Sequence, residues 1–180
     1  MSSLTTKKII AYEFKELLKE KPFNKITVND IAKKCDINRQ TFYYHFQDIQ
    51  DLVEWICSEE TNKILNNNNS NCKTWEDKFL TIFNLIYEEK IFVINIYHSV
   101  SLEILRRNLY KMVYPIMYEE IEKMSKENNE YNEEDIIFVT NFYKYAFVAI
   151  VLNWIEEGMK ENPQIIVKKV SQVVKRKKCI

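Results

Sequence analysis

The scarcity of glycine limits the fold of this chain more than any other feature. The 180 residues include one glycine, Gly158, and three prolines, Pro22, Pro115 and Pro163. Hairpins between β-strands need backbone with positive φ, which glycine supplies most easily, so a sheet protein of this length would contain more of it. Apolar residues also recur at helical spacing along most of the chain, which predicts an all-α fold of about nine helices.

The composition indicates a folded chain and argues against several kinds of site. Hydrophobic residues make up 46% of the sequence, and 26 basic side chains balance 26 acidic ones. Any contact with DNA must therefore come from the placement of cations rather than from a net positive charge. The four cysteines show no Cys-x-x-Cys spacing and the two histidines lie far apart, which argues against a metal site and predicts free thiols in a reducing cytoplasm.

The longest fully apolar run, 145–152, is too short to span a membrane. We expect a cytoplasmic protein with no metal, cofactor or membrane partner.

Four helices are expected before residue 65. Apolar residues at helical spacing predict a first helix over 6–21, which ends before Pro22. Thr27 and Asp30 form a capping-box pattern at the start of a short second helix, and Asn38 is a suitable N-cap for a third. A fourth helix is expected over 49–64. Two short helices joined by a short turn are typical of a helix-turn-helix.

The third expected helix has an unusual outward face. Phe42 and Phe46 are four residues apart in the sequence and would anchor the helix on the core of its domain. The remaining residues have three possible explanations: an ordinary amphipathic helix, a metal site at His45, or a surface that contacts a partner. A metal site is disfavoured because no second ligand lies at helical spacing from His45. The outward residues combine guanidinium, amide and phenol groups: Arg39, Gln40, Tyr43 and Tyr44.

The stretch ITVNDIAKKCDINRQTFYYHFQDIQDLVEWI, residues 26–56, resembles the DNA-binding domain of the TetR/AcrR family of transcriptional regulators. The resemblance rests on Thr27 at the start of the second helix, on Ile31-Ala32, and above all on TFYYHF followed by an acid-rich start to the fourth helix. It is close over the first third of the chain and looser over the helical layout of the rest. Within the family, INRQTFYYHF and NWIEEGMKENP are most similar to the regulators encoded beside dihydroxyacetone kinase genes.

The resemblance implies a three-helix helix-turn-helix domain over residues 1–48 and a helical regulatory and dimerisation domain over 49–180. It also implies that the third helix contacts double-stranded DNA. We expect Arg39 to pair with guanine and Gln40 with adenine, and Tyr43 to contact a sugar or a thymine methyl group. Phosphate contacts are expected from hydroxyl and imidazole groups and from the start of the second helix. The full set of expected DNA contacts is Thr27, Asn38, Arg39, Gln40, Thr41, Tyr43, Tyr44 and His45.

Three positions depart from the family pattern. Asp36 stands in the turn where many members have glycine, and it tolerates a left-handed conformation better than most residues do. Gln40 replaces glycine or another small residue. Ile49 occupies the start of the fourth helix, where members usually have a lysine that reaches a phosphate, so one backbone contact is lost or supplied elsewhere. Lys7 and Lys8 in the first helix either approach the DNA backbone or are ordinary solvated surface.

The segment IIFVTNFYKYAFVAIVLNWI predicts a long helix over 134–157 that ends at Gly158. It is apolar on nearly all sides and must be buried on more than one of them. Asn162 and Pro163 then begin a last helix. By likeness to the family, the last two helices of each subunit form the dimer interface, so we expect a homodimer on a palindromic operator. The expected interface residues are Phe147, Val151, Trp154, Ile166 and Val170.

Tyrosines are frequent in the C-terminal part, where family members usually hold a small-molecule effector. An effector would change the spacing of the two recognition helices in the dimer. Each of these side chains has an ordinary structural role as its alternative explanation. The expected effector-binding residues are Tyr87, Tyr97, His98, Tyr110, Tyr114 and Tyr143.

Two functional hypotheses follow. The first is a one-component repressor that binds DNA and is released by a small-molecule effector. The second is a coactivator or partner-dependent regulator without a small-molecule pocket of its own. A closed cavity lined by polar groups would favour the first, and a packed interior would favour the second. An enzyme is not expected, because the sequence has no glycine-rich phosphate loop, no HExxH motif and no plausible triad.

Overall fold

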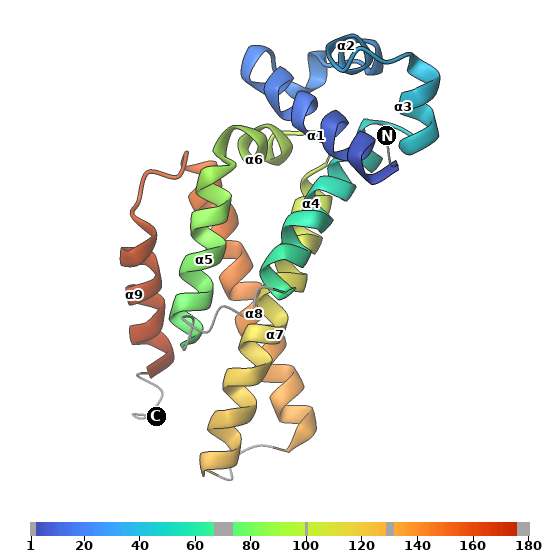
Figure 1. Ribbon diagram of the computed structural model, residues 1–180. Coiled ribbons are helices and arrows are strands. Elements are labelled where there is room, and N and C mark those ends of the chain that lie inside the picture. Colours follow the sequence, from blue (N-terminus) through green and yellow to red (C-terminus); the bar gives the residue numbers. More distant parts are fainter. Residues whose placement is uncertain (1–2, 67–73, 100, 129–131, 176–180) are drawn as a thin grey trace. The chain divides into compact units, whose positions relative to one another are not determined.

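The computed structural model describes residues 3–66, 74–99, 101–128 and 132–175 (Figure 1). These residues form nine α-helices and one short 3-10 helix, and no strand occurs among them. The predicted all-α fold is therefore confirmed. The elements are α1 (Ser3–Glu20), η1 (Phe23–Lys25), α2 (Val28–Lys34), α3 (Arg39–His45), α4 (Ile49–Asn66), α5 (Trp75–Glu88), α6 (Lys90–Tyr97), α7 (Leu102–Asn128), α8 (Glu133–Glu156) and α9 (Pro163–Lys175).

Short sequence signals set the starts of several helices. At α2 the Thr27 backbone N–H donates to Asp30 over 2.8 Å, and the Asp30 N–H donates to the Thr27 hydroxyl oxygen over 3.2 Å. Reciprocal bonds of this kind satisfy two of the amide groups that a helix start leaves unpaired. The same arrangement opens α5 at Thr74 and α8 at Asn132. The predicted capping box of α2 is confirmed.

The first compact unit comprises residues 1–60 and 90–105. Its core is built around Phe14 of α1, which is fully buried and meets the ring of Phe92 of α6 edge-on at 6.4 Å. The backbone N–H of Phe23 donates to the side-chain oxygen of Asn95 over 3.1 Å, which also attaches α6 to this unit. The boundary predicted after residue 48 stays a prediction, since this unit also includes the first part of α4 and all of α6.

The second compact unit comprises residues 61–89 and 106–180. Phe79 of α5 stacks on Phe147 of α8 with ring centroids 3.7 Å apart, and Phe83 meets Trp154 at 5.0 Å. α9 packs along α5 (Figure 1), and the Ser171 hydroxyl donates to the Glu76 carboxylate over 2.8 Å. Aromatic side chains of α5 and α8 therefore form the centre of this core.

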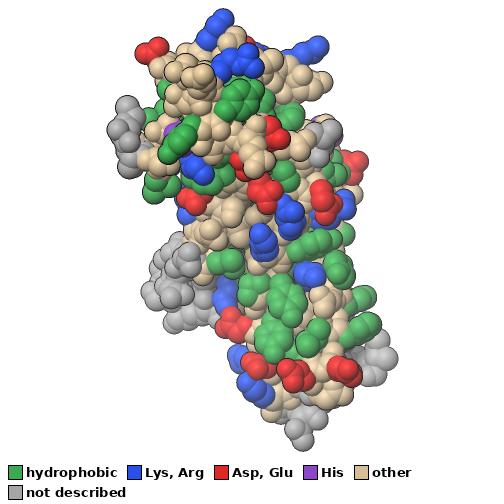
Figure 2. Space-filling view, turned by 90° about the vertical axis from the view of Figure 1, so that its right-hand side faces the viewer, with side chains coloured by type: hydrophobic (Ala, Val, Ile, Leu, Met, Phe, Trp, Pro, Cys, Tyr) green, Lys and Arg blue, Asp and Glu red, His purple; other side chains and the backbone are tan. Residues whose placement is uncertain are grey.

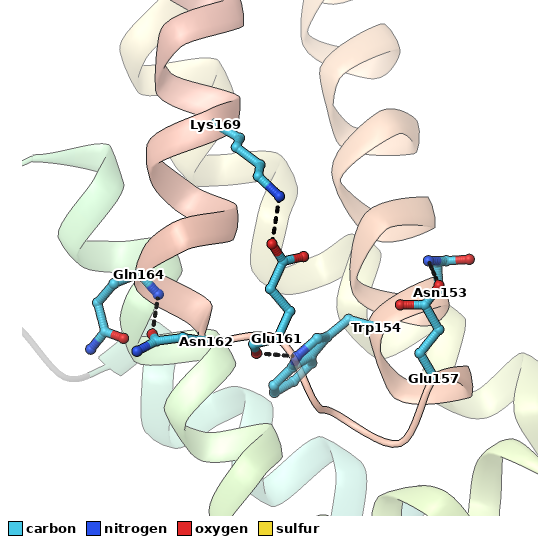
Figure 3. A network of polar contacts seen from close by, with 7 residues as sticks. All are labelled: Asn153, Trp154, Glu157, Glu161, Asn162, Gln164 and Lys169. Atoms are coloured by element: carbon cyan, nitrogen blue, oxygen red, sulfur yellow. Dashed lines mark hydrogen bonds and ion pairs between the residues drawn. The ribbon is translucent and has the colours of Figure 1, made fainter.

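The corner between α8 and α9 confirms two sequence predictions (Figure 3). Gly158 has φ 77° and follows the end of α8, as expected of a residue at C′. Asn162 accepts a bond from the Gln164 N–H over 2.9 Å, and α9 begins at Pro163. The indole N–H of Trp154 donates to the carbonyl oxygen of Glu161 over 2.8 Å (Figure 3), which ties the end of α8 to the corner.

Cys35 and Cys57 are thiols that take part in no disulfide, as predicted. Burial raises the pKa of Cys57 to about 12 and that of Cys35 to about 11. Both thiols are therefore protonated and unreactive near neutral pH. The other two cysteines lie outside the described residues.

Candidate nucleic-acid interface

The turn between α2 and α3 is built around Asp36. This residue has φ 52°, in the left-handed region that glycine usually occupies, and its short polar side chain tolerates that conformation. The Ile37 N–H donates to the Ala32 carbonyl oxygen over 3.0 Å and closes the turn. The predicted left-handed turn is confirmed, and it sets the direction in which α3 leaves α2.

α3 is fixed to the first unit by two phenylalanines. Phe42 and Phe46 are buried, and their rings contact each other with centroids 5.9 Å apart. Phe46 also contacts Trp55 of α4 at 5.9 Å. These contacts leave the opposite face of α3 free of the core, as the sequence predicted.

That outward face exposes aromatic rings beside polar groups. Tyr44 is 81% exposed and Tyr43 is 49% exposed. The guanidinium group of Arg39 lies 5.9 Å from the Tyr43 ring centre, and one of its N–H groups donates to the Tyr43 hydroxyl over 3.4 Å. Arg39, Gln40, Tyr43 and Tyr44 are all exposed. Large exposed aromatic side chains on a short helix indicate a surface that is covered by a partner.

Three of the predicted DNA contacts are already engaged within the chain. The Asn38 side-chain oxygen caps α3 by accepting the Thr41 N–H over 2.7 Å, and it also accepts the Thr41 hydroxyl over 3.0 Å. The Thr27 hydroxyl donates to Asp30 over 2.7 Å. In this structure neither threonine hydroxyl therefore has its proton free for a phosphate. Lys21 and Thr27 hold the pKa of the Asp30 carboxyl well below its usual range, so this cap remains charged.

His45 ends α3 beside the first turn of α1. Its Nδ1 lies 3.5 Å from the Ser3 hydroxyl, and its ring meets Tyr44 edge-on at 5.0 Å. Desolvation and the nearby charge of Lys7 lower the pKa of His45 below its ordinary 6.5, so the ring is neutral at pH 7. A neutral imidazole still donates one hydrogen bond to a phosphate. Among the described residues, no group of three or more His, Cys, Asp or Glu side chains is placed to hold a metal ion.

Two family models match this chain. The model described as bacterial regulatory proteins, tetR family, matches residues 15–56, and the transcriptional regulator C-terminal region model matches residues 73–176. Together they cover the helix-turn-helix and most of the second unit. The chain belongs to the TetR family. Its family models describe transcriptional regulators, which agrees with the prediction that the chain is not an enzyme.

One relative regulates a dihydroxyacetone kinase operon, as the predicted subgroup does. The HTH-type dhaKLM operon transcriptional activator DhaS of Lactococcus lactis subsp. lactis (strain IL1403) is 37% identical over 98 residues. That match spans 52% of this chain and 52% of the relative, about half the length of each. The predicted likeness to regulators of dihydroxyacetone kinase operons is confirmed.

Solved structures of TetR-like regulators show the same fold. The dihydroxyacetone kinase operon activator DhaS superposes with a TM-score of 0.69 at 23% identity, covering 97% of this chain and 96% of that one. The fatty acid degradation regulator FadR from Bacillus halodurans gives 0.68 at 17% identity, covering 93% of each chain. NalD of Pseudomonas aeruginosa gives 0.67 at 14% identity, covering 97% of each chain. At these identities the likeness establishes the fold alone.

The residues predicted to bind an effector are divided between the two compact units. Tyr97 and His98 belong to the first unit, and Tyr87 is exposed beside Trp154 in the second. Tyr110 and Tyr114 of α7 lie close together around Lys144 of α8, whose ammonium is 5.2 and 5.6 Å from their ring centres. The Tyr145 ring centre is 4.3 Å from the same ammonium, and Asn141 accepts its hydrogen bond over 2.7 Å. The remaining predicted residue, Tyr143, is half-buried on α8.

Most of the predicted interface residues lie in the core of the chain itself. The prediction is revised for four of them, because a side chain that is buried within its own subunit has no surface left to contact a second one. Val170 is half-exposed and remains available. The four buried residues are Phe147, Val151, Trp154 and Ile166.

The apolar side chains that α8 does expose were not predicted. Phe138, Phe142 and Tyr145 are 73%, 62% and 54% exposed, and their spacing places them on one face of the helix. Figure 2 shows hydrophobic side chains gathered on the surface of the second unit over α7 and α8. By length and composition α8 is also apolar enough to cross a membrane, as the core helices of many soluble proteins are, and only 22% of its most apolar stretch is buried within the chain. The signal was present in the spacing, but the sequence could not show which face the core would cover.

Proposed function

We propose that this TetR-family protein is a cytoplasmic, sequence-specific DNA-binding regulator that acts as a homodimer on a palindromic operator. The observation that carries the proposal is the outward face of α3, where Tyr44 is 81% exposed next to Arg39 and Gln40 while Phe42 and Phe46 are buried. A helix that is anchored on one side and polar, aromatic and cationic on the other suits insertion into the major groove.

The side chains of α3 divide into two roles. Arg39 reads a guanine through two hydrogen bonds, and Gln40 reads an adenine. Tyr43 supports Arg39 through the contact between them and adds a sugar or methyl contact. Tyr44 and His45 donate to backbone phosphates. Thr27, Asn38 and Thr41 contribute mainly by holding the starts of α2 and α3 in place. The side chains of Thr27 and Asn38 cap those helices, and the Thr41 hydroxyl donates to the capping oxygen of Asn38.

The exposed stripe on α8 supports the homodimer. One helix-turn-helix contacts few base pairs, so specific binding needs two of them on two half-sites. Phe138, Phe142 and Tyr145 give α8 an uncovered apolar face, and Ile165 and Val173 are exposed on α9. Apolar faces of this kind are covered by a partner in soluble proteins, and a second copy of the chain supplies an identical face.

The protein could regulate transcription in two ways, by repression or by activation. The first is a repressor that a small molecule releases, with Tyr110, Tyr114 and Lys144 as the candidate group that binds it. The second is an activator or partner-dependent regulator, favoured by the name of the Lactococcus relative, a transcriptional activator.

Two grooves in the second unit do not decide between these forms. One of about 590 Å³ lies between α5 and α9, and one of about 420 Å³ lies between α5 and α7. Both are open to solvent, and neither is lined by a predicted effector residue.

Selection of binding sites from a random duplex pool tests the proposal. The purified protein is expected to enrich a palindrome, and Arg39→Ala is expected to relax the preference at one guanine in each half-site by about 1–3 kcal/mol. Lys160→Ala removes one exposed positive charge from the second unit and serves as the matched control, with no change in preference. Failure of the folded wild-type protein to enrich any site would refute an autonomous DNA-binding regulator and favour the partner-dependent form.

A further inference from the structure

The lysines of the first unit differ in the groups that their ammonium ions contact. Two lysines in the middle and at the end of α1, one just after it and one at the end of α2 pair with carboxylates. Lys7 in the first part of α1 forms no ion pair with any carboxylate in the described part of the chain. The pairs are Lys15–Glu60 at 3.4 Å, Lys19–Glu16 at 2.5 Å, Lys21–Asp30 at 2.8 Å and Lys34–Glu20 at 2.6 Å.

Lys7 is held by aromatic rings instead. Its ammonium lies 5.0 Å from the ring centre of Phe46 and 5.9 Å from that of Trp55. Phe46 is the residue that ends α3, and it is buried. A cation over two ring faces keeps its charge unneutralised, so it remains free to attract an anion. The two rings also fix the position of a side chain that would otherwise be mobile, which reduces the entropy lost on binding.

The neighbours of Lys7 are neutral donors. The Lys7 charge contributes to the lowered pKa of His45, which places the two groups close together. Ser3 lies 3.5 Å from Nδ1 of His45, and Tyr44 contacts the same ring. When the Ser3 hydroxyl donates to Nδ1, the neutral ring carries its proton on Nε2 and offers that N–H outward. The corner between α1 and α3 thus combines one cation with neutral hydrogen-bond donors, a combination that suits a phosphate of the DNA backbone.

The start of α4, next along the chain, does not offer the same chemistry. Asp48 accepts the Asp51 N–H over 2.8 Å, and Asp51 accepts the Gln47 N–H over 2.9 Å. Carboxylates therefore already occupy these amide groups, and their negative charge disfavours a phosphate there. Ile49, at the first position of the helix, has no charge to add.

We propose that Lys7 is the phosphate-binding cation at the end of α3, and that Phe46 and Trp55 are the positioning residues that hold it there. This inference rests on the proposed DNA-binding function and adds a contact from α1 to it. Lys7, Tyr44 and His45 then bind one phosphate from three sides. The contact is independent of sequence, so it sets affinity and register rather than the choice of bases.

The salt dependence of DNA binding tests this inference. Affinity for the selected operator duplex and for a scrambled duplex of equal length is measured over a range of KCl concentrations. Each phosphate that a lysine neutralises contributes about 0.9 to the slope of log affinity against log salt, so Lys7→Gln is expected to flatten the slope by about 1.8 per dimer on both duplexes. Lys7→Arg keeps the charge and is expected to keep the slope.

Lys19→Gln is the matched control, because it removes one positive charge from the same helix at a residue that is paired with Glu16. Its slope is expected to equal that of the wild type. In the free protein, Lys7→Gln is also expected to raise the pKa of His45, measured by NMR titration of the imidazole.

The outcomes separate the inference from the function on which it rests. A wild-type protein that selects a palindrome, with a Lys7→Gln slope no flatter than that of Lys19→Gln, would overturn the role of Lys7 alone. A wild-type protein that binds neither duplex would overturn both the inference and the proposed function.

Discussion

The outward faces of α3 and α8 both expose aromatic side chains, but the other side chains on the two faces differ in chemistry. On α3, Tyr43 and Tyr44 follow Arg39 and Gln40, and the guanidinium group lies across the Tyr43 ring. The guanidinium group donates hydrogen bonds, and the amide and phenol groups can both donate and accept them. This face therefore suits a polar and negatively charged partner such as DNA.

The face of α8 has a different composition. Phe138, Phe142 and Tyr145 form a continuous apolar stripe, and Ala146 and Ala149 beside them are also exposed. Such a face gains most by packing against another apolar surface. Exposed aromatic area alone therefore does not indicate the kind of partner in this protein. The polar or apolar side chains beside the rings indicate it.

The strongest test of the α3 face exchanges a buried ring for a small one. Phe42→Ala removes a fully buried side chain and is expected to lower the free energy of unfolding of the first unit by about 3–5 kcal/mol, with loss of DNA binding. Tyr43→Ala on the same helix removes a half-exposed ring and is expected to keep the fold. Thermal unfolding followed by circular dichroism measures both. Equal destabilisation by the two variants would contradict the division of α3 into a buried and an outward face.

The α8 face is tested by the association of two chains. Phe142→Ala is expected to weaken dimerisation by about 2 kcal/mol or more, roughly thirtyfold in Kd, because it removes an aromatic anchor from the proposed interface. Tyr12→Ala on α1 is a matched control, since Tyr12 and Phe142 are both 62% exposed. Sedimentation equilibrium measures the two dissociation constants. An unchanged dimer in Phe142→Ala would place the interface elsewhere.

A smaller effect is expected at the start of α3. Asn38→Ala removes the side-chain oxygen that accepts the Thr41 N–H over 2.7 Å, and loss of an N-cap costs about 1 kcal/mol of stability. Asn38→Ser keeps a capping oxygen and is expected to retain most of that stability. Denaturant titration compares them. If Asn38→Ala instead left stability unchanged and abolished DNA binding, Asn38 would be a direct DNA contact, as the sequence had suggested.

The smallest expected effect is the pH dependence at His45. Because the pKa of this histidine is lowered below its ordinary 6.5, the imidazole of the free protein is mostly neutral between about pH 8 and pH 6.5 and adds little charge to attract DNA there. Below that range the ring gains a charge that a phosphate favours, so affinity is expected to rise as the pH falls. The unfolded chain takes up the proton at a higher pH than the folded one, so the free protein loses stability over the same interval.

A pH titration of operator affinity, with His45→Gln as the control, measures the effect. A wild-type affinity that rises no more than that of His45→Gln as the pH falls below 6.5 would contradict a phosphate contact from the protonated ring.

Local patterns predicted the elements of the fold well. The capping box at Thr27, the N-cap at Asn38 and the C′ glycine at position 158 each depend on residues a few positions apart, and the structure confirms all three. The outward face of α3 could be predicted for the same reason. Two phenylalanines four residues apart determine which side of a short helix is buried.

Tertiary contacts decided what the sequence could not predict. α8 is apolar on nearly every side, so its pattern did not show that Phe79 would stack on Phe147 and leave Phe138 and Phe142 exposed. The place of Lys7 was equally hidden, because it depends on the start of α1 lying beside the end of α3. The engagement of the Thr27 and Thr41 hydroxyl groups within the chain also became visible only with the geometry.

The most direct test of the central claim removes the outward face of α3 without touching its anchors. In Arg39→Ala/Gln40→Ala/Tyr44→Ala, all three altered side chains are exposed, so the Tm and the dimer Kd are expected to match those of the wild type. Fluorescence anisotropy with the selected operator duplex is expected to show two wild-type chains bound per duplex and a loss of more than about 100-fold in affinity in the variant. A variant that bound the operator with unchanged affinity and sequence preference would contradict the assignment of α3 as the DNA-reading helix.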